Sequence, residues 1–225
     1  LGVNQMLDLS KYRIVDLSMR CSRGRQREGW DRRLELKRSR IPYDNTIMHE
    51  INTVSHIGTH VEGPSHYLAE LKDISQFPLE IFIGEAILFR LTGMKPNQGV
   101  KPIDLDKNER VRRGHIALLR VESRFTQEER PYLSVEGAWW LVKKGVKLIG
   151  IDRTLRLEKP GARGPNNLPV HDVFLRNGIP IIEFLENLDR LRKKRFILIA
   201  LPLRIVGLDA SPVRAIAMER NLKQN

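Results

Sequence analysis

The stretch SHIGTHVEGPSH, residues 55–66, contains three of the six histidines of this 225-residue chain. Glycine and the β-branched Thr59 and Val61 make it a poor helix. The pair Gly63-Pro64 then predicts a tight turn. We therefore expect a short strand that runs directly into a turn, with the three histidines distributed around that junction.

The spacing of polar residues in this stretch predicts a metal site. On an extended chain His60 and Glu62 point to the same side, and Gly58 allows a bend that brings His56 to them. Two imidazoles and a carboxylate suit Zn²⁺ or Mn²⁺. His66 lies just past the turn, close to the expected metal, where a general acid/base would act.

Apolar patterning outside this stretch predicts an α/β or α+β protein. Strands are expected over residues 12–18, 47–55, 81–91, 116–121, 147–151, 196–203 and 213–218. A helix is expected after the N-cap Ser134, ending at Gly145, and another over residues 170–177, closed by Gly178. Residues 183–191 are a further helix candidate. With no internal repeat and no clear linker, residues 1–225 are interpreted as one domain.

Composition limits the possible classes of protein. Hydrophobic residues make up 41% and charged residues 29%, which is typical of a globular chain. The longest apolar run has eight residues, 196–203, against about 18 for a spanning helix, so no membrane association is expected. Cys21 is the only cysteine, and no leader segment is recognised. These features predict a cytoplasmic protein.

The net charge of +12 is concentrated in the chain. Residues 20–40 hold nine Lys or Arg against three acids, and residues 190–195 add five more basic side chains. Such segments raise the hypothesis of a basic nucleic-acid-binding metalloprotein. No helix-turn-helix, zinc-finger or RNA-binding signature accompanies them, so specific nucleic-acid binding is not expected and a solvated basic face is the preferred interpretation.

Three segments together resemble the cyclase family, which includes metal-dependent kynurenine formamidases and isatin hydrolases. Residues 55–66 resemble the family signature H-x-G-[TA]-H-x-D-x-P-x-H. VHDVFLRNGIPIIE, residues 170–183, resembles its second metal segment, and IALPLRIVGLDASPVRA, residues 199–215, its C-terminal strand pair. GID at residues 150–152 also fits. The similarity extends over about residues 47–218.

The resemblance implies a fold and a set of site residues. The fold is α/β, of the three-layer β/β/α swivelling-domain type with a mixed central sheet, usually in a homodimer or larger oligomer such as a tetramer. His56, His60 and Glu62 match metal ligands, His171 and Glu183 match ligands that complete a second metal site, and His66 matches the catalytic histidine. Two departures from the family pattern are visible. Glu62 replaces the family's aspartate, and residues 19–40 lack the Pro/Gly-rich turn near the substrate pocket.

The implied activity is metal-dependent hydrolysis of an amide by one or two Zn²⁺ or Mn²⁺ ions per chain. An arylformamidase acting on an N-formylkynurenine-type substrate in tryptophan catabolism is the leading hypothesis. A cyclic amide (isatin-like) hydrolase is the alternative, and Glu62 leaves open a metal-binding member without catalysis. No G-x-S-x-G motif supports a serine nucleophile, and Ser65 is not preferred as one.

Other polar and aromatic residues are open to two interpretations. Asp209, Ser211 and Arg214 form either a structural turn, the preferred interpretation, or support for the site. Trp139 and Trp140 are expected in the core or an interface. Trp30 could cap an aromatic substrate or serve packing.

Overall fold

A mixed nine-stranded sheet dominates the described part of the protein, a computed structural model that covers residues 8–26, 32–107, 110–162 and 167–221. The four strands at its centre run parallel, and the pairs toward both ends are antiparallel. In spatial order the strands are β1 (Tyr12–Asp16), β14 (Ile216–Arg220), β12 (Arg195–Ile199), β6 (Ile83–Leu91), β8 (Ile116–Val121), β10 (Leu148–Asp152), β11 (Ile181–Leu185), β5 (His60–Glu62) and β13 (Ala210–Pro212).

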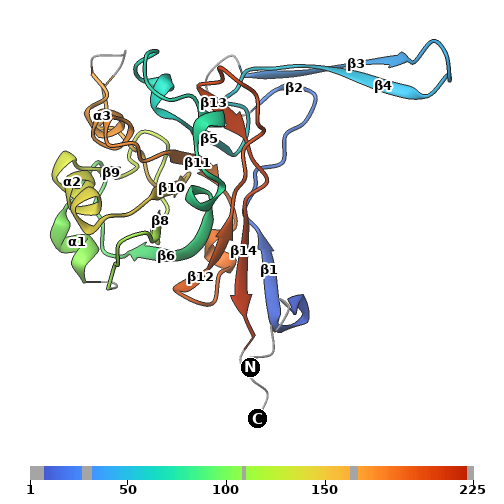
Figure 1. Cartoon of the computed structure of the whole chain (residues 1–225). Helices are drawn as coiled ribbons and strands as arrows, with labels where there is room; N and C mark the ends of the chain where they lie inside the picture. The colour runs from blue at the N-terminus through green and yellow to red at the C-terminus, as the bar shows by residue number, and fades with distance from the viewer. Residues whose placement is uncertain (1–7, 27–31, 108–109, 163–166, 222–225) are drawn as a thin grey trace.

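The central strands are buried on both faces, which explains their continuous apolar sequence. In β6 the side chains of Ile87 and Phe89 enter one core and those of Ala86 and Leu88 enter the other. The first core lies between the sheet and the helices. The second joins central strands to β1, β12, β14 and β5, because the sheet curls around it. The expected α/β fold with a mixed sheet is confirmed (Figure 1).

Three α-helices, α1 (Pro102–Asp106), α2 (Val135–Lys144) and α3 (Pro169–Arg176), lie on one side of the sheet (Figure 1). The expected signals begin and end α2: the Ser134 hydroxyl accepts a hydrogen bond from the Gly137 amide, and Gly145 is left-handed at φ 75°. Pro169 occupies the first turn of α3, which places His171 on its inner side. The helices predicted around residues 135–144 and 170–177 are therefore confirmed.

The helix predicted over residues 183–191 is wrong. Its first part belongs to β11, which pairs in parallel with β10 and antiparallel with β5. Ile181, Ile182 and Leu185 are buried between the two cores, and this burial outweighs the helical propensity of the segment. The chain then makes only a single 3₁₀ turn, Leu188–Arg190.

Two predicted strands are shorter than expected. The strand predicted over residues 196–203 ends at Ile199, and Leu201 and Leu203 are exposed beyond it. Of the strand predicted over residues 213–218, only the last three residues belong to a strand, β14, and residues 213–215 connect it to β13. The other predicted strands in the sheet are confirmed, as is the strand and turn of residues 55–66, where β5 leads into the 3₁₀ turn Pro64–His66.

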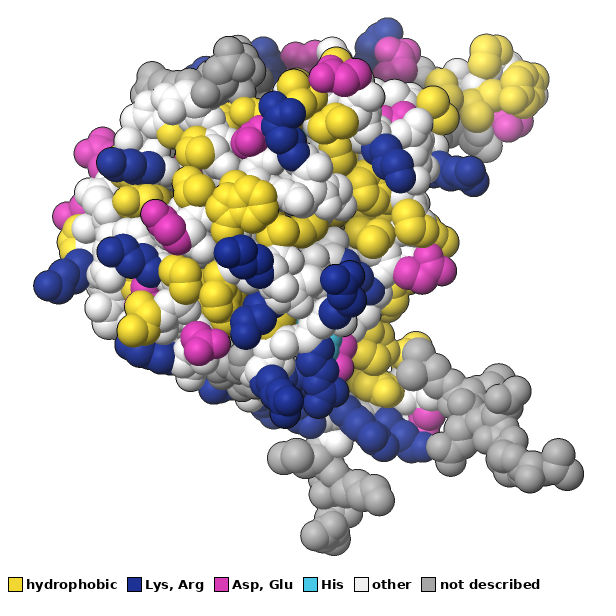
Figure 2. All heavy atoms as spheres, turned by 60° about the vertical axis from the view of Figure 1, so that its left-hand side comes forward, with side chains coloured by type: hydrophobic (Ala, Val, Ile, Leu, Met, Phe, Trp, Pro, Cys, Tyr) yellow, Lys and Arg dark blue, Asp and Glu magenta, His cyan; other side chains and the backbone are white. Residues whose placement is uncertain are grey.

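The basic segment and the residues after it form an arm. Here β3 (Arg33–Arg40) and β4 (Ile47–Asn52) make a hairpin that projects from the body, with β2 (Gly24–Arg25) at its base (Figure 1). Large apolar side chains, Tyr43, Ile47 and Met48, are exposed near its far end (Figure 2). Two shorter strands, β7 (Gly99–Val100) and β9 (Tyr132–Leu133), pair beside α2.

Candidate metal centre and catalytic site

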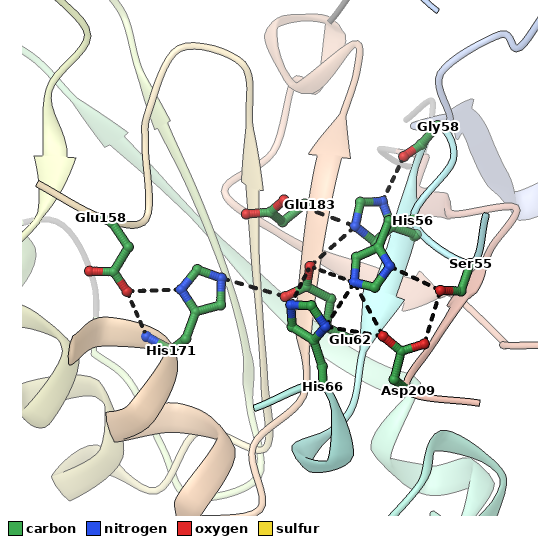
Figure 3. A network of polar contacts seen from close by, with 10 residues as sticks. Ser55, His56, Gly58, Glu62, His66, Glu158, His171, Glu183 and Asp209 are labelled. Carbon is green, nitrogen blue, oxygen red and sulfur yellow. Dashed lines mark hydrogen bonds and ion pairs between the residues drawn. The ribbon is translucent and has the colours of Figure 1, made fainter. Parts of the chain in front are cut away.

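The Glu62 carboxylate on β5 lies at the meeting point of four imidazole rings (Figure 3). Its Oε1 is 3.3 Å from Nε2 of His60, 3.4 Å from Nε2 of His56 and 3.9 Å from Nε2 of His66. Its Oε2 is 3.5 Å from Nε2 of His171. The predicted site residues therefore converge on one buried oxygen pair, and each histidine presents the same ring nitrogen to it.

Glu183 completes the cluster from the neighbouring strand. The antiparallel register of β5 and β11 pairs Glu183 with His60, and the Glu183 Oε2 lies 3.9 Å from the His60 Nε2. The expected alternation along β5 is confirmed, because His60 and Glu62 point to the same side and Val61 enters the second core.

Gly58 produces the bend that the sequence predicted. It adopts a left-handed φ of 60°, and a Cβ at this position would lie only 2.3 Å from the Sγ of Cys21. The bend places the Gly58 carbonyl 2.8 Å from the Nδ1 of His60. Because a carbonyl can only accept, Nδ1 carries the proton and Nε2 keeps its lone pair for the centre.

Glu158 orients His171 in the same way. Its Oε1 lies 2.8 Å from the His171 Nδ1 and also accepts from the backbone amides of Val170 and His171, each at 2.9 Å. The carboxylate thus holds the first turn of α3 and the imidazole together. A carboxylate that fixes the outer nitrogen of a histidine is a common support for metal ligands.

Asp209, in the loop before β13, supports the other two histidines. Its Oδ2 lies 3.1 Å from the His66 Nδ1, and its Oδ1 accepts from the Ser55 hydroxyl at 2.9 Å. The Ser55 Oγ lies 2.9 Å from the His56 Nδ1. This chain of hydrogen bonds holds both rings with Nε2 toward Glu62 (Figure 3).

The charges and pKa values of the buried side chains at the centre favour binding of a cation. Burial would raise the pKa of Glu62, but the neighbouring imidazoles of His171 and His60 hold it well below its usual value. Burial and then the charge of Glu62 raise the pKa of Glu183. Burial lowers the pKa of His56 to about 4, so this ring is neutral at pH 7. Burial works to lower the pKa of His171, but hydrogen bonds to Glu158 and Glu62 raise it to about 10. Two close, buried carboxylates beside the neutral His56 match the needs of a divalent metal ion, whose binding would displace the proton of His171.

The donor atoms also have the spacing that a metal ion requires. Two groups within the described residues, His56–Glu62–His66 and His60–Glu62–Glu183, each hold ligand atoms within 4.8 Å of one another. The Glu62 Oε2 is buried without a hydrogen bond in that part of the chain. Nitrogen and carboxylate donors of this kind fit Zn²⁺ or Mn²⁺, and Glu62 belongs to both groups.

His66 differs from the other three histidines in its surroundings. Its side chain is 29% exposed, against 0% for His60. Burial works to lower the pKa of His66, but the hydrogen bond to Asp209 and the charge of Glu62 raise it above its ordinary value. An accessible imidazole that can carry a proton beside a metal site suits a general acid/base.

The site contains residues that the sequence interpretation missed. Asp209 was assigned to a structural turn, and its contact with His66 corrects that preference. Glu158 was not among the predicted site residues. Ser211 is structural, since its Oγ accepts from the Leu203 amide, and Arg214 pairs with Asp16 at the surface.

The remaining candidates have simpler roles or lie elsewhere. Trp140 packs edge-on against Phe89, as expected for a core position, while Trp139 is exposed. The Ser65 hydroxyl is buried and makes no hydrogen bond within the described residues, so no base of that part of the chain contacts it. Trp30 lies outside the described residues.

One residue of the basic segment reaches the site. The Arg32 guanidinium lies 5.0 Å from the ring centroid of Phe184, directly after Glu183. The proximity of its charge opposes the rise in the pKa of Glu183 that burial causes. Arg32 is therefore part of the site environment and not of a purely solvated face.

No helix among the described residues is both long enough and apolar enough to cross a membrane.

Comparison with known proteins agrees with this geometry. The family model described as "Putative cyclase" matches residues 15–155. The kynurenine formamidase of Geobacillus thermodenitrificans is 34% identical over 172 residues, which cover 74% of this chain and 77% of that protein. The kynurenine formamidase of Bacillus cytotoxicus is 33% identical over 165 residues, covering 72% and 75%.

Solved structures share the fold at lower sequence identity. An isatin hydrolase A from Labrenzia aggregata superposes with a TM-score of 0.79 at 20% identity, covering 94% of this chain and 95% of that one. A structure described as a potential metal-dependent hydrolase with cyclase activity gives 0.73 at 24% identity, covering 94% and 100%. The family model covers more than half of the sequence, two relatives exceed 30% identity, and the chain therefore belongs to the cyclase family.

Proposed function

We propose that this protein is a metal-dependent amide hydrolase that acts on an aryl formamide of the N-formylkynurenine type. The convergence of His56, His60, His66 and His171 on the Glu62 carboxylate carries this proposal. The names of the relatives, kynurenine formamidases, support the same reaction. Hydrolysis of a cyclic, isatin-like amide uses the same chemistry and is the alternative substrate class.

We assign His56, His60, Glu62, His171 and Glu183 to the metal and His66 to proton transfer. A bound Zn²⁺ or Mn²⁺ supplies Lewis-acid chemistry, lowering the pKa of water and polarising a carbonyl oxygen. Glu62 belongs to both donor groups and can serve one or two ions. The anchored Nδ1 atoms keep the Nε2 lone pairs of the ligand histidines directed at the centre.

His66 moves the proton in the proposed reaction. Its Nε2 accepts a proton from water as the water oxygen bonds to the formamide carbon, and it delivers that proton to the leaving nitrogen as the carbon–nitrogen bond breaks. The products are formate and an aromatic amine. Asp209 stabilises the protonated ring through Nδ1, and an anilide nitrogen leaves more readily than an alkyl amine.

The His66→Ala variant tests this assignment. It should keep the metal content of the unmodified protein and lose about 10²–10⁴-fold in kcat, the usual contribution of a general acid/base. Hydrolysis of N-formylkynurenine is followed spectrophotometrically and metal is measured by elemental analysis. Unchanged turnover in this variant would remove His66 from the mechanism, and loss of the metal would make it a ligand.

We further propose that the protein is cytoplasmic and forms a homo-oligomer, a dimer or tetramer. The oligomer is supported by the arm, a hairpin that projects from the body and exposes apolar side chains such as Ile47 and Ile51. Sedimentation velocity measures the oligomeric state directly. A monomer at micromolar concentration would contradict this part of the proposal.

A further inference from the structure

A cleft of about 390 Å³ opens beside the metal-binding residues, on the side of Glu183 and His171. Besides these two residues, its walls include Arg156, Lys159 and Phe184. The cleft therefore joins the proposed reaction centre to a region that combines basic side chains with an aromatic surface.

The acidic side chains that line the cleft interact with neighbouring protein groups or belong to the proposed metal site. Glu158 accepts hydrogen bonds from His171 and two backbone amides. Asp152 accepts from the amide and hydroxyl of Thr154. Glu183 belongs to a donor group that can hold a metal ion. Each of these carboxylates is thus held by groups at the wall of the cleft or by the proposed metal site.

Two arginines, Arg156 in the wall of the cleft and Arg32 over the Phe184 ring, form no salt bridge among the described residues. The Arg156 guanidinium donates to the backbone carbonyl of Gln127, which carries no net charge. The Arg32 guanidinium lies 5.0 Å from the ring centroid of Phe184. Arg153, another cation of the cleft wall, is excluded from this role because it lies 3.6 Å from the Glu186 carboxylate. Arg156 thus has no acidic partner in the cleft, and Arg32 is near only the Glu183 carboxylate, which the proposed function assigns to the metal.

Phe184 is held in an unfavourable backbone conformation that places it in the cleft. Its φ of 56° is left-handed, which is rare for a bulky residue. The register of β10 against β11 shifts at this point, and the Thr59 hydroxyl donates to the Phe184 carbonyl at 2.6 Å. Consecutive strand residues normally face opposite sides, but Glu183 and Phe184 both line the cleft. Strain of this kind is characteristic of functional positions.

We propose that this cleft selects amide substrates that carry a carboxylate, which Arg32 and Arg156 bind while Phe184 packs against the aromatic ring. The proposal rests on the proposed hydrolase function and names its substrate class. Planar guanidinium groups match the geometry of a carboxylate, and the Phe184 ring lies within 5.6 Å of the His60 ring, centroid to centroid. An aryl formamide with a carboxylate on its ring or side chain would span both features.

Binding of anthranilate to the Zn²⁺-loaded protein tests the arginines without any need for turnover. By calorimetry, Arg156→Ala and Arg32→Ala should each weaken anthranilate binding about 10-fold or more, as expected for a lost charge-assisted hydrogen bond. Arg156→Lys should recover part of the loss, and aniline, which lacks the carboxylate, should bind weakly to every form. Arg220→Ala, an exposed arginine at the end of β14, is the matched control and should bind as the unmodified protein does.

Equal anthranilate affinity in the unmodified protein and both cleft variants would overturn the proposal, because the carboxylate would then bind the metal or nothing. Equal affinity for aniline and anthranilate would overturn it as well.

Kinetics separate this inference from the proposed function. The unmodified enzyme should hydrolyse N-formylanthranilate with a higher kcat/KM than formanilide, and Arg156→Ala should reduce that ratio through KM. Equal kcat/KM values for both substrates would contradict the inference while the hydrolase function stands. Anthranilate binding that depends on Arg156, together with no hydrolysis of either formamide or of N-formylkynurenine, would support the cleft assignment and contradict the function.

Discussion

Each histidine of the site is fixed through Nδ1 by a different acceptor, which leaves Nε2 for the centre. The acceptors are the Ser55 hydroxyl, the Gly58 carbonyl, and the Asp209 and Glu158 carboxylates. The hydroxyl and the carbonyl hold two of the proposed metal ligands, His56 and His60. A carboxylate also stabilises positive charge, which suits the acid/base role proposed for His66. Glu158 holds the proposed ligand His171 in the same way, so the type of acceptor alone does not separate the two roles.

The Asp209→Asn variant should lower the pKa of His66. In the folded protein the hydrogen bond to Asp209 raises the pKa of His66 above its ordinary value of 6.5. The same bond lowers the pKa of Asp209 to about 2. A raised histidine pKa contributes stability that is fully present below the unfolded value and is lost as the pH rises through the folded value. The loss of stability in the variant should therefore be largest below about pH 6.5.

NMR titration of the metal-free protein measures the pKa of His66 directly, and chemical denaturation at pH 5.5 and 8.5 measures the stability. An unchanged pKa in Asp209→Asn would show that Asp209 does not support this ring. Asp8→Asn, which changes an exposed acid at the other end of the chain, is the control for loss of one negative charge.

The ligand cluster could be predicted from sequence because its first members are local. His56, His60 and Glu62 lie within seven residues, and strand alternation with one glycine bend is enough to bring them together. Asp209 and Ser55 are 154 residues apart, and Phe184 reaches the site only through a shift in strand register. No local pattern encodes these contacts, since they depend on which strands become neighbours.

At the scale of elements, burial determines whether a segment forms a helix or a strand when its local propensity does not. Residues 183–191 have helical propensity, yet β11 fills the gap between β10 and β5 and carries Glu183 to His60. Helix α2, by contrast, has both caps and helical periodicity in its own sequence, so its prediction did not depend on neighbours. The strand that brings Glu183 to the site is therefore determined by packing against neighbouring strands and not by its local sequence.

The bend at Gly58 provides a test of the link between β5 and the site. Gly58→Ala should destabilise the protein by about 2–4 kcal/mol, because it adds left-handed strain of about 1–2 kcal/mol to a clash with the Cys21 Sγ. Gly161→Ala is the matched control, since its φ is 87° with no atom near the new Cβ. Gly161→Ala should therefore lose only the stability that left-handed backbone strain costs, about 1–2 kcal/mol.

Denaturant unfolding of the two variants measures this difference. The double variant Cys21→Ala/Gly58→Ala should recover part of the stability by removing the clashing sulfur. Equal destabilisation by Gly58→Ala and Gly161→Ala would show that the contact with Cys21 has no energetic effect.

At the scale of the whole molecule, the basic charge is concentrated on the arm and its base. In the hairpin, Lys37 pairs with Glu50 and Arg33 with Glu35 on one face. The other face combines Arg38 and Arg40 with Ile51. Two of the four basic side chains of β3 are thus paired with acids of the hairpin. This surface should therefore bind polyanions only through weak, non-specific attraction.

Duplex DNA binding as a function of salt tests the nucleic-acid hypothesis. We expect weak, sequence-independent binding that falls with a log–log slope of about −0.9 per phosphate contacted and disappears near 0.15 M salt. Replacing Arg33, Arg38 and Arg40 by Gln should abolish it without changing metal content. A sequence-selective complex that persists at about 0.15 M salt would make nucleic-acid binding the primary function.

The central claim is that the histidine and glutamate cluster of β5, β11 and α3 holds a metal ion, and His60→Ala tests it most directly. His60 is buried, and its Nε2 faces both Glu62 and Glu183. His49→Ala, on the exposed strand β4, is the matched control. After equal loading with Zn²⁺ and dialysis, elemental analysis should find metal retained in the unmodified protein and in His49→Ala, and close to none in His60→Ala. Full metal content in folded His60→Ala would contradict the account.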